Sequence, residues 1–208
     1  MSRAHIFVSL FVITALVQLA APLSIIWQHE QALRLGRAYK FRTAPVDPYD
    51  ALRGRYVALQ FDQTTVPLPD TALALVPDQR VYVLLEESAD GFAHFTTVLL
   101  TPPAAGDYLG VEVAWVDSAR QVVALRLPFE RFYLEEATAP AAEQVYREHS
   151  RRGQQDAYAL VRVRHGRGVL ANLYIGDTPI ADFVRTSRQG SLTGLVCLAP
   201  QKWRTAWP

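Results

Sequence analysis

The residues with the chemical means to bind a ligand lie close together in one short stretch, DPYDALRGRYVALQF, residues 47–61. Carboxylates and guanidinium groups stand beside a proline and a glycine here, and Arg53 is placed to pair with Asp47 or Asp50 across a turn. A binding site with no catalytic residue is the functional interpretation of this stretch. The residues expected to be functionally sensitive are Asp47, Pro48, Asp50, Arg53, Gly54 and Tyr56.

A structural role is the simpler interpretation of the same stretch. Pro48 biases Asp47 toward an extended backbone, and the Asp50 side chain can cap a turn. Gly54 permits backbone angles that other residues avoid. Local chemistry therefore favours a shaped start to a sheet, with ligand binding as the alternative.

A Ser/Lys peptidase is the first catalytic alternative. Such an enzyme needs a serine soon after a membrane anchor and a buried lysine that can act as its base. After Ser24 the next serine is Ser88, and the only lysines are Lys40 and Lys202. The spacing does not support this chemistry, so a peptidase remains a distant third hypothesis.

Thiol and metal chemistry are also poorly supported. Cys197 is the single cysteine, which excludes an intramolecular disulfide, and its apolar setting LVCLAP is typical of a small buried side chain. The five histidines show no ligand spacing, and His94 within FAHFT suits a strand whose ring nitrogen is hydrogen-bonded. We therefore expect no metal and no cofactor.

Aromatic residues offer one more candidate surface. At strand and tail positions they more often form core or cover an edge than a platform for a ligand or partner. The residues concerned are Phe129, Phe132, Tyr133, Trp203 and Trp207.

Composition limits the function classes. The chain has 208 residues, half of them apolar, and a net charge of +1. Nucleic-acid binding needs a concentrated basic face, which this balance does not provide. The length suits one main domain after an N-terminal segment is set aside.

The N-terminal segment AHIFVSLFVITALVQLAAPLSIIW, residues 4–27, contains no Lys, Arg, Asp or Glu. Its length matches the roughly 20 residues that a helix needs to cross a bilayer. We expect an uncleaved transmembrane helix that binds the lipid bilayer. A cleaved signal peptide is the alternative, because LAAPLS resembles a cleavage site, although apolar residues continue to Trp27.

The charges around this segment conflict with an exported domain. Only Arg3 precedes the segment, whereas Arg34, Arg37, Lys40 and Arg42 follow it. The positive-inside rule would then place the following residues in the cytoplasm, but large folded domains translocate largely regardless of charge. Orientation stays open on the residues alone.

After the anchor the pattern changes to a two-residue period, as in RYVALQF. Three pairs of alternating segments flank short turns, and each pair predicts an antiparallel hairpin. The pairs are 80–87 with 92–100, 108–117 with 121–129, and 157–164 with 168–175. The fold class is therefore mainly β, an antiparallel meander or partly open barrel, with an N-terminal transmembrane helix.

One short helix interrupts the strands, in TAPAAEQVYREHSRRG. Ala142, Val145, Tyr146 and His149 recur at helical spacing, Thr138 is a candidate cap, and Gly153 lies past the end. We expect residues 1–30 to form the anchor and 31–208 the β-rich domain, with a sub-boundary near 135–155.

The stretch 47–61 resembles the signature of the GDYXXLXY family of bacterial membrane-anchored proteins. Gly54, Tyr56, Leu59 and the aromatic Phe61 match the signature, while Arg55 stands at its acidic position. The segments RTAPVDP and RFYLEE, each near a helix, are also similar to the family pattern. The resemblance implies an extracytoplasmic domain held by one anchor and accompanied by a polytopic membrane protein, without an established activity.

We therefore expect a single-pass protein of the inner membrane with its C-terminal domain on the periplasmic side. Its expected function is that of an accessory or interaction domain, working with a polytopic membrane partner through the anchor or an exposed sheet edge. The alternative is a domain that binds a small ligand or an envelope component in an apolar pocket between sheet and helix.

Overall fold

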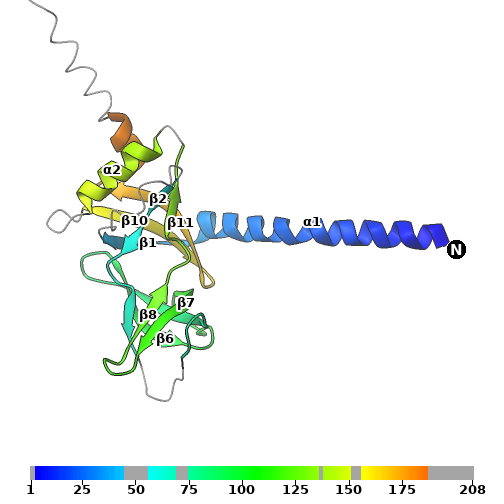
Figure 1. Ribbon diagram of the computed structural model, residues 1–208, viewed down its shortest axis with the longest axis horizontal. Coiled ribbons are helices and arrows are strands. Elements are labelled where there is room, and N and C mark those ends of the chain that lie inside the picture. The colour runs from blue at the N-terminus through cyan, green and yellow to red at the C-terminus, as the bar shows by residue number, and fades with distance from the viewer. Residues whose placement is uncertain (1–2, 45–55, 69–74, 136–137, 151–155, 187–208) are drawn as a thin grey trace, which may run out of the picture. The chain divides into compact units, whose positions relative to one another are not determined.

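The computed structural model describes residues 3–44, 56–68, 75–135, 138–150 and 156–186, and confirms a mainly antiparallel β fold with an N-terminal helix (Figure 1). The chain divides into two compact units. The first contains Met1–Arg42, Phe61–Phe129 and Ala159–Ala171, and the second contains Thr43–Gln60, Glu130–Tyr158 and Asn172–Pro208.

The first unit begins with one long helix, α1 (Arg3–Leu35). It confirms the helix expected over residues 4–27 and continues beyond it, because Glu30, Gln31, Ala32 and Leu33 are good helix formers. By length and composition this is the one helix among the described residues that could cross a membrane, and none of its apolar window is buried. Gly36 follows the helix, where a side chain would collide with the Ala32 carbonyl oxygen.

The same unit contains a five-stranded sheet in the order β4-β8-β7-β5-β6. Its strands are β4 (Thr65–Pro67), β5 (Arg80–Glu87), β6 (Ala93–Leu99), β7 (Tyr108–Asp117) and β8 (Val122–Arg126). The pairs β5–β6 and β7–β8 are antiparallel, which confirms the first two predicted hairpins. Gly91, with φ of 78°, supplies the turn between β5 and β6.

This sheet nearly closes into a barrel, because its edge strands β4 and β6 contact each other. The Gln63 side chain helps to close it: its Nε2 donates to the Phe95 carbonyl at 3.2 Å and its Oε1 accepts from the Phe95 amide at 3.1 Å. A buried aromatic cluster packs within the same unit, with ring centroids 5.4–6.1 Å apart. Its members are Phe41, Phe61, Phe95 and Phe129.

A second five-stranded sheet has the order β12-β11-β10-β1-β3. Its strands are β1 (Arg37–Ala44), β3 (Gln60–Phe61), β10 (Ala157–Arg164), β11 (Arg167–Ile175) and β12 (Thr178–Pro179). The neighbours β10 and β11 confirm the third predicted hairpin. Its two turn residues, His165 and Gly166, both have positive φ, of 48° and 75°, as a type I′ turn requires.

The second unit also holds the ribbon of β2 (Tyr56–Ala58) and β9 (Arg131–Tyr133), and the helix α2 (Ala139–His149). The predicted interrupting helix is therefore confirmed, with Ala142 and Tyr146 fully buried. Thr138 occupies the cap position, but its side chain makes no capping hydrogen bond. Gly153 lies outside the described residues.

A short helical segment at residues 180–186 was not expected from the sequence. Ile180 and Val184, four residues apart, are its buried contacts. A segment of two turns offers too few apolar repeats for periodicity to reveal it.

Candidate functional site

Most of the predicted binding stretch lies outside the described residues. This applies to Asp47, Pro48, Asp50, Arg53 and Gly54. Tyr56 is described: it opens β2 directly opposite Tyr133 of β9, with ring centroids 5.7 Å apart. The Arg131 guanidinium carbon lies 5.0 Å from the centroid of the Tyr56 ring. Tyr56 therefore belongs to a group of two tilted aromatic rings and one cation on a two-stranded ribbon.

The aromatic residues divide between core and surface. Phe129 is buried within the aromatic cluster of the first unit, so its predicted role in the core is confirmed. Tyr133 is 66% exposed beside Tyr56. Trp203 and Trp207 lie outside the described residues, as does Cys197.

A row of charged side chains crosses three neighbouring strands of the first unit. Arg80 on β5 is opposite Glu112 on β7, and Glu112 is opposite Arg126 on β8. Side chains of directly opposed residues share one face of a sheet. The strand register thus assembles an Arg-Glu-Arg row from residues that are up to 46 positions apart, which sequence patterns alone did not reveal.

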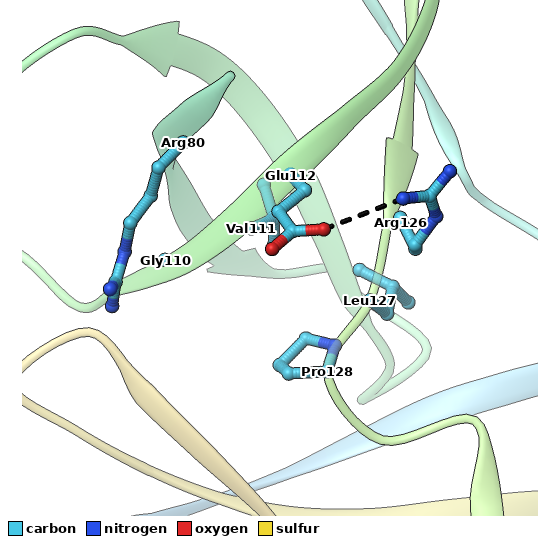
Figure 2. Close-up of a pocket in the computed structure, with 7 residues that line it drawn as sticks. All are labelled: Arg80, Gly110, Val111, Glu112, Arg126, Leu127 and Pro128. Atoms are coloured by element: carbon cyan, nitrogen blue, oxygen red, sulfur yellow. Dashed lines mark hydrogen bonds and ion pairs between the residues drawn. The ribbon is translucent and has the colours of Figure 1, made fainter. Parts of the chain in front are cut away.

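This row borders a hollow of about 340 Å³, shown in Figure 2. Arg126 Nη1 donates to Asp78 Oδ1 at 2.9 Å and lies 3.5 Å from Glu112 Oε2. Figure 2 shows the Glu112 carboxylate directed toward Arg126, while Arg80 extends along Gly110. Among the described residues Arg80 forms no ion pair. The hollow therefore offers a small anionic group one guanidinium that forms no ion pair with the other described residues.

The described residues that line this hollow include no side chain suited to covalent catalysis. Its other lining residues are Gly110, Val111, Leu127 and Pro128, so its described lining includes no serine, cysteine, threonine, lysine or histidine. It also lacks aromatic side chains, which commonly provide the apolar contact area of small-molecule pockets. The charged side chains that line the hollow suit ion pairing with a small charged group.

A second hollow, of about 150 Å³, lies at the β5–β6 turn and includes Ser88 and His94. Ser88 Oγ is 3.0 Å from His94 Nδ1, so the expectation of a strand histidine with a hydrogen-bonded ring nitrogen is confirmed. Glu86 Oε2 lies 3.8 Å from His94 Nε2 and is largely exposed. This distance exceeds the about 2.6–3.2 Å of a hydrogen bond, so Glu86 does not hold His94 as the acid of a catalytic triad holds its histidine.

Three of the four basic residues that follow the anchor form ion pairs within the first unit. Arg34 pairs with Glu30, and Arg37 Nη1 lies 3.3 Å from Asp107 Oδ2. The Arg42 guanidinium is 2.8 Å from Asp90 and lowers the pKa of that carboxyl below its ordinary value.

The buried Tyr39 shares this region, and its hydroxyl donates to Asp107 Oδ2 at 2.7 Å. Burial, followed by this hydrogen bond, raises the pKa of Tyr39 above its ordinary value. Arg37 and Tyr39 thus connect β1 to Asp107, which directly precedes β7. The role of these contacts is structural.

Metal binding finds no support in the part of the chain that the structure describes. No three side chains of His, Cys, Asp or Glu gather there closely enough to hold an ion.

A profile of the GDYXXLXY protein family matches residues 18–173, three quarters of the chain. The chain belongs to the GDYXXLXY family. The resemblance drawn from the sequence is thereby confirmed, and no curated protein or solved structure matches the chain significantly.

Two of the matching positions within the GDYXXLXY signature have a visible structural role. Leu59 and Phe61 are 4% and 6% exposed, so they supply core side chains within their respective units. Phe61 packs in the aromatic cluster, and the Leu59 amide donates to the Glu130 carbonyl at 2.8 Å. At these positions the GDYXXLXY signature specifies packing, while its described aromatic Tyr56 is only partly buried.

Proposed function

We propose that this chain is a single-pass protein of the inner membrane, in which α1 crosses the bilayer and holds residues 31–208 as a periplasmic accessory domain. One observation carries the proposal: the large apolar side chains from Phe7 to Trp27 are exposed, by 48–73%. Leaving such side chains in water costs about 1.5–3 kcal/mol for each one. Lipid is the medium that removes this cost along the whole helix.

The dimensions of the helix agree with a bilayer. Residues 4–27 rise about 36 Å at about 1.5 Å per residue, which exceeds the roughly 30 Å of hydrocarbon by a margin that a modest tilt accommodates. Pro22 is tolerated in such a helix. The Ser24 and Thr14 hydroxyls donate to carbonyls of their own helix, so neither needs water.

The periplasmic orientation is supported by two arguments. Residues Arg37, Lys40 and Arg42 belong to strand β1 of the folded body, and long folded domains translocate largely regardless of their charge. The chain also belongs to the GDYXXLXY family. The resemblance to this family implies an extracytoplasmic domain, which supports a periplasmic orientation.

The partner would be a polytopic membrane protein that packs against α1. Gln18 lies near the middle of the apolar segment, and its amide has no hydrogen bond within the described residues. Ala15 and Ala21, three residues to either side, leave room for a second helix to approach closely. A buried amide in lipid gains from a polar group on that helix.

Sheet edges are weaker candidates for this contact. The edge strands β3 and β12 have two residues each, and the side chain of Gln63 hydrogen-bonds both backbone groups of Phe95 on the edge strand β6. Short and covered edges discourage an added strand.

Photo-crosslinking in native membranes tests the partner. A probe in place of Gln18 should capture one defined polytopic membrane protein. A probe in place of Leu16, which is two residues away and therefore on the opposite side of the helix, should not capture it. Equal capture from both positions, or capture from neither, would refute a partner at the Gln18 face.

Orientation is tested separately by fusing reporters after Pro208. A reporter that is active only after export should work, and one that is active only in the cytoplasm should fail. The reverse pattern would overturn the periplasmic assignment while leaving the anchor intact.

Binding of a small anionic envelope component is the second candidate, and Arg80, which forms no ion pair among the described residues and lines the 340 Å³ hollow, favours it. A ligand of this class should raise the melting temperature of the wild-type chain by mass action. The same ligand should raise the melting temperature of the Arg80→Gln variant much less. Arg120→Gln, at an exposed arginine away from the hollow, is the control and should respond like the wild type. An equal rise in melting temperature in the wild type and both variants would exclude this site.

A further inference from the structure

A third hollow, of about 280 Å³, forms where the turn of the β10–β11 hairpin meets the C-terminal part of α1. Helix residues Trp27, Gln28 and Gln31 line one side, and Arg164 and Arg167 line the other. All of them belong to the first unit. Its volume equals that of about nine water molecules at about 30 Å³ each, which leaves room for a phosphodiester group.

Two neutral amides orient the two guanidinium groups. Arg164 Nη1 donates to Gln31 Oε1 at 2.8 Å, and Arg167 Nη2 donates to Gln28 Oε1. Gln28 and Gln31 are three residues apart and so share one face of the helix. The arginines are thus held against the helix by partners that leave their positive charge intact.

No carboxylate of the described residues forms an ion pair with Arg164 or Arg167. Glu30, the nearest acid along the helix, pairs with Arg34 instead. This contrasts with Arg37, Arg42 and Arg126, each of which has a carboxylate partner. Two adjacent cations with neutral partners favour an anionic ligand.

The turn that carries these arginines is fixed in place. The Gly166 carbonyl accepts a 2.7 Å hydrogen bond from the Gly110 amide of β7. Gly166 has φ of 75°, and a Cβ there would lie 2.5 Å from the Tyr108 ring. The guanidinium groups are therefore presented from a turn with little freedom to move, which lowers the entropic cost of binding.

The level of the hollow along α1 identifies the source of the anion. Gln28 and Gln31 follow Trp27, the last residue of the charge-free segment 4–27, by one and four positions, or about 1.5 and 6 Å along the axis. Tryptophan concentrates at the boundary between hydrocarbon and headgroups. If α1 spans the bilayer, Arg164 and Arg167 lie at the depth of the lipid phosphates.

We propose that Arg164 and Arg167, held by Gln31 and Gln28, bind the phosphate of an anionic phospholipid headgroup. The proposal rests on the proposed function, because it requires α1 to be in the membrane. Phosphate oxygens suit the planar donors of arginine, and Trp27 adds a contact for the lipid glycerol and upper chain. The hairpin would then dock the domain on the membrane surface as well as on the helix.

The test uses the full-length chain reconstituted in phosphatidylcholine bilayers that contain trace spin-labelled lipid. The lipid held against the protein gives a motionally restricted signal, and the ratio of association for labelled phosphatidylglycerol over phosphatidylcholine measures selectivity. We expect a ratio of about five for the wild type, from the attraction of arginines near a phosphate. The double variant Arg164→Gln/Arg167→Gln should lower the ratio to about one.

Two further variants separate the site from general charge. The double variant Arg120→Gln/Arg185→Gln removes the same charge at exposed positions away from the hollow and should keep the wild-type ratio. The double variant Arg164→Lys/Arg167→Lys retains the charge and should keep most of the selectivity, with folding of each variant checked by circular dichroism. Unchanged selectivity in Arg164→Gln/Arg167→Gln would overturn the proposal, as would an equal loss in Arg120→Gln/Arg185→Gln.

Inorganic phosphate added at constant ionic strength distinguishes a free anion from a lipid. The selectivity should persist, and its loss would show a site for free phosphate instead. Failure of the proposed function looks different, because a chain that does not enter the bilayer would restrict neither lipid. A motionally restricted lipid signal with no preference for phosphatidylglycerol would be consistent with a membrane-spanning α1. It would refute the headgroup site.

Discussion

At the residue scale, the backbone of Gly166 tolerates few other residues. Its φ of 75° is unfavourable for other residues, and a Cβ there would lie 2.5 Å from the Tyr108 ring. The strain and the collision affect the turn that contacts both β7 and α1. Glycine at this position is therefore a requirement of packing.

We expect Gly166→Ala to lower the free energy of unfolding by about 3 kcal/mol, because backbone strain and the collision add. For a chain of this size that corresponds to a fall in melting temperature of roughly 6–12 °C. Thermal unfolding of the full chain in detergent, followed by circular dichroism, measures it.

Gly176→Ala is the matched control for this substitution. Gly176 also has positive φ, 55°, but a Cβ there would meet no atom within 4 Å. Its replacement should therefore cost only the backbone strain, about 1 kcal/mol. Equal losses in the two variants would contradict the role assigned to the Tyr108 contact.

The hydroxyl of Tyr39 links β1 to Asp107 through a 2.7 Å hydrogen bond. At pH 7, Tyr39→Phe should lower the free energy of unfolding by about 1.5–3 kcal/mol, the range for a hydrogen bond to a charged group. Denaturant unfolding in detergent measures the difference. Tyr133→Phe removes an exposed hydroxyl and should change stability little.

Alkaline pH gives the same bond a second test. Because the pKa of Tyr39 is raised on folding, its contribution is complete below the ordinary pKa of 10.0 and declines as pH rises above it. The unfolded chain then releases a proton that the folded chain retains. The stability gap between wild type and Tyr39→Phe should therefore narrow above pH 10, and a gap that widens would contradict this account.

At the element scale, the barrel-like sheet is closed by a side chain. Gln63 supplies one donor and one acceptor to the backbone of Phe95, as a neighbouring strand would. An edge completed in this way is protected from pairing with other chains.

Gln63→Ala should lower the free energy of unfolding by about 1–3 kcal/mol, the sum of two ordinary hydrogen bonds. It should also speed hydrogen exchange in β6, most of all at the Phe95 amide, as read by mass spectrometry of peptides from the full chain. Gln144→Ala is the control, because the one partner of the Gln144 amide among the described residues is Glu148, on the surface of α2. Unchanged exchange in β6 would show that β4 closes the edge without Gln63.

The sequence predicted the elements well where local signals are strong. Asp90-Gly91 and His165-Gly166 marked turns because positive φ is confined to few residue types, and alternation placed the strands on either side. The contacts of Gln63 with Phe95 and of Arg164 with Gln31 join residues 32 and 133 positions apart, and no local pattern encodes such pairs. The Arg80, Glu112 and Arg126 row depends on strand register in the same way.

At the scale of the whole molecule, the sequence predicted a lipid-facing helix followed by a β-rich body, since a charge-free segment needs no tertiary information to be recognised. The sequence did not predict the division into two units, because each unit is made of three separate stretches of the chain. The predicted binding residues from Asp47 to Gly54 lie outside the described residues and remain a prediction. The proposed headgroup site, formed by Arg164 and Arg167 beside α1, could not be predicted from the sequence, because its residues come together only in the folded chain.

Extraction of native membranes with alkaline carbonate tests the central claim most directly. This treatment releases proteins bound at the surface and leaves those whose apolar segments lie within the bilayer. We predict that the intact chain, with residues 4–27 still attached, stays in the membrane pellet and leaves it only with detergent. Recovery of the intact chain in the soluble fraction would contradict a membrane-spanning α1.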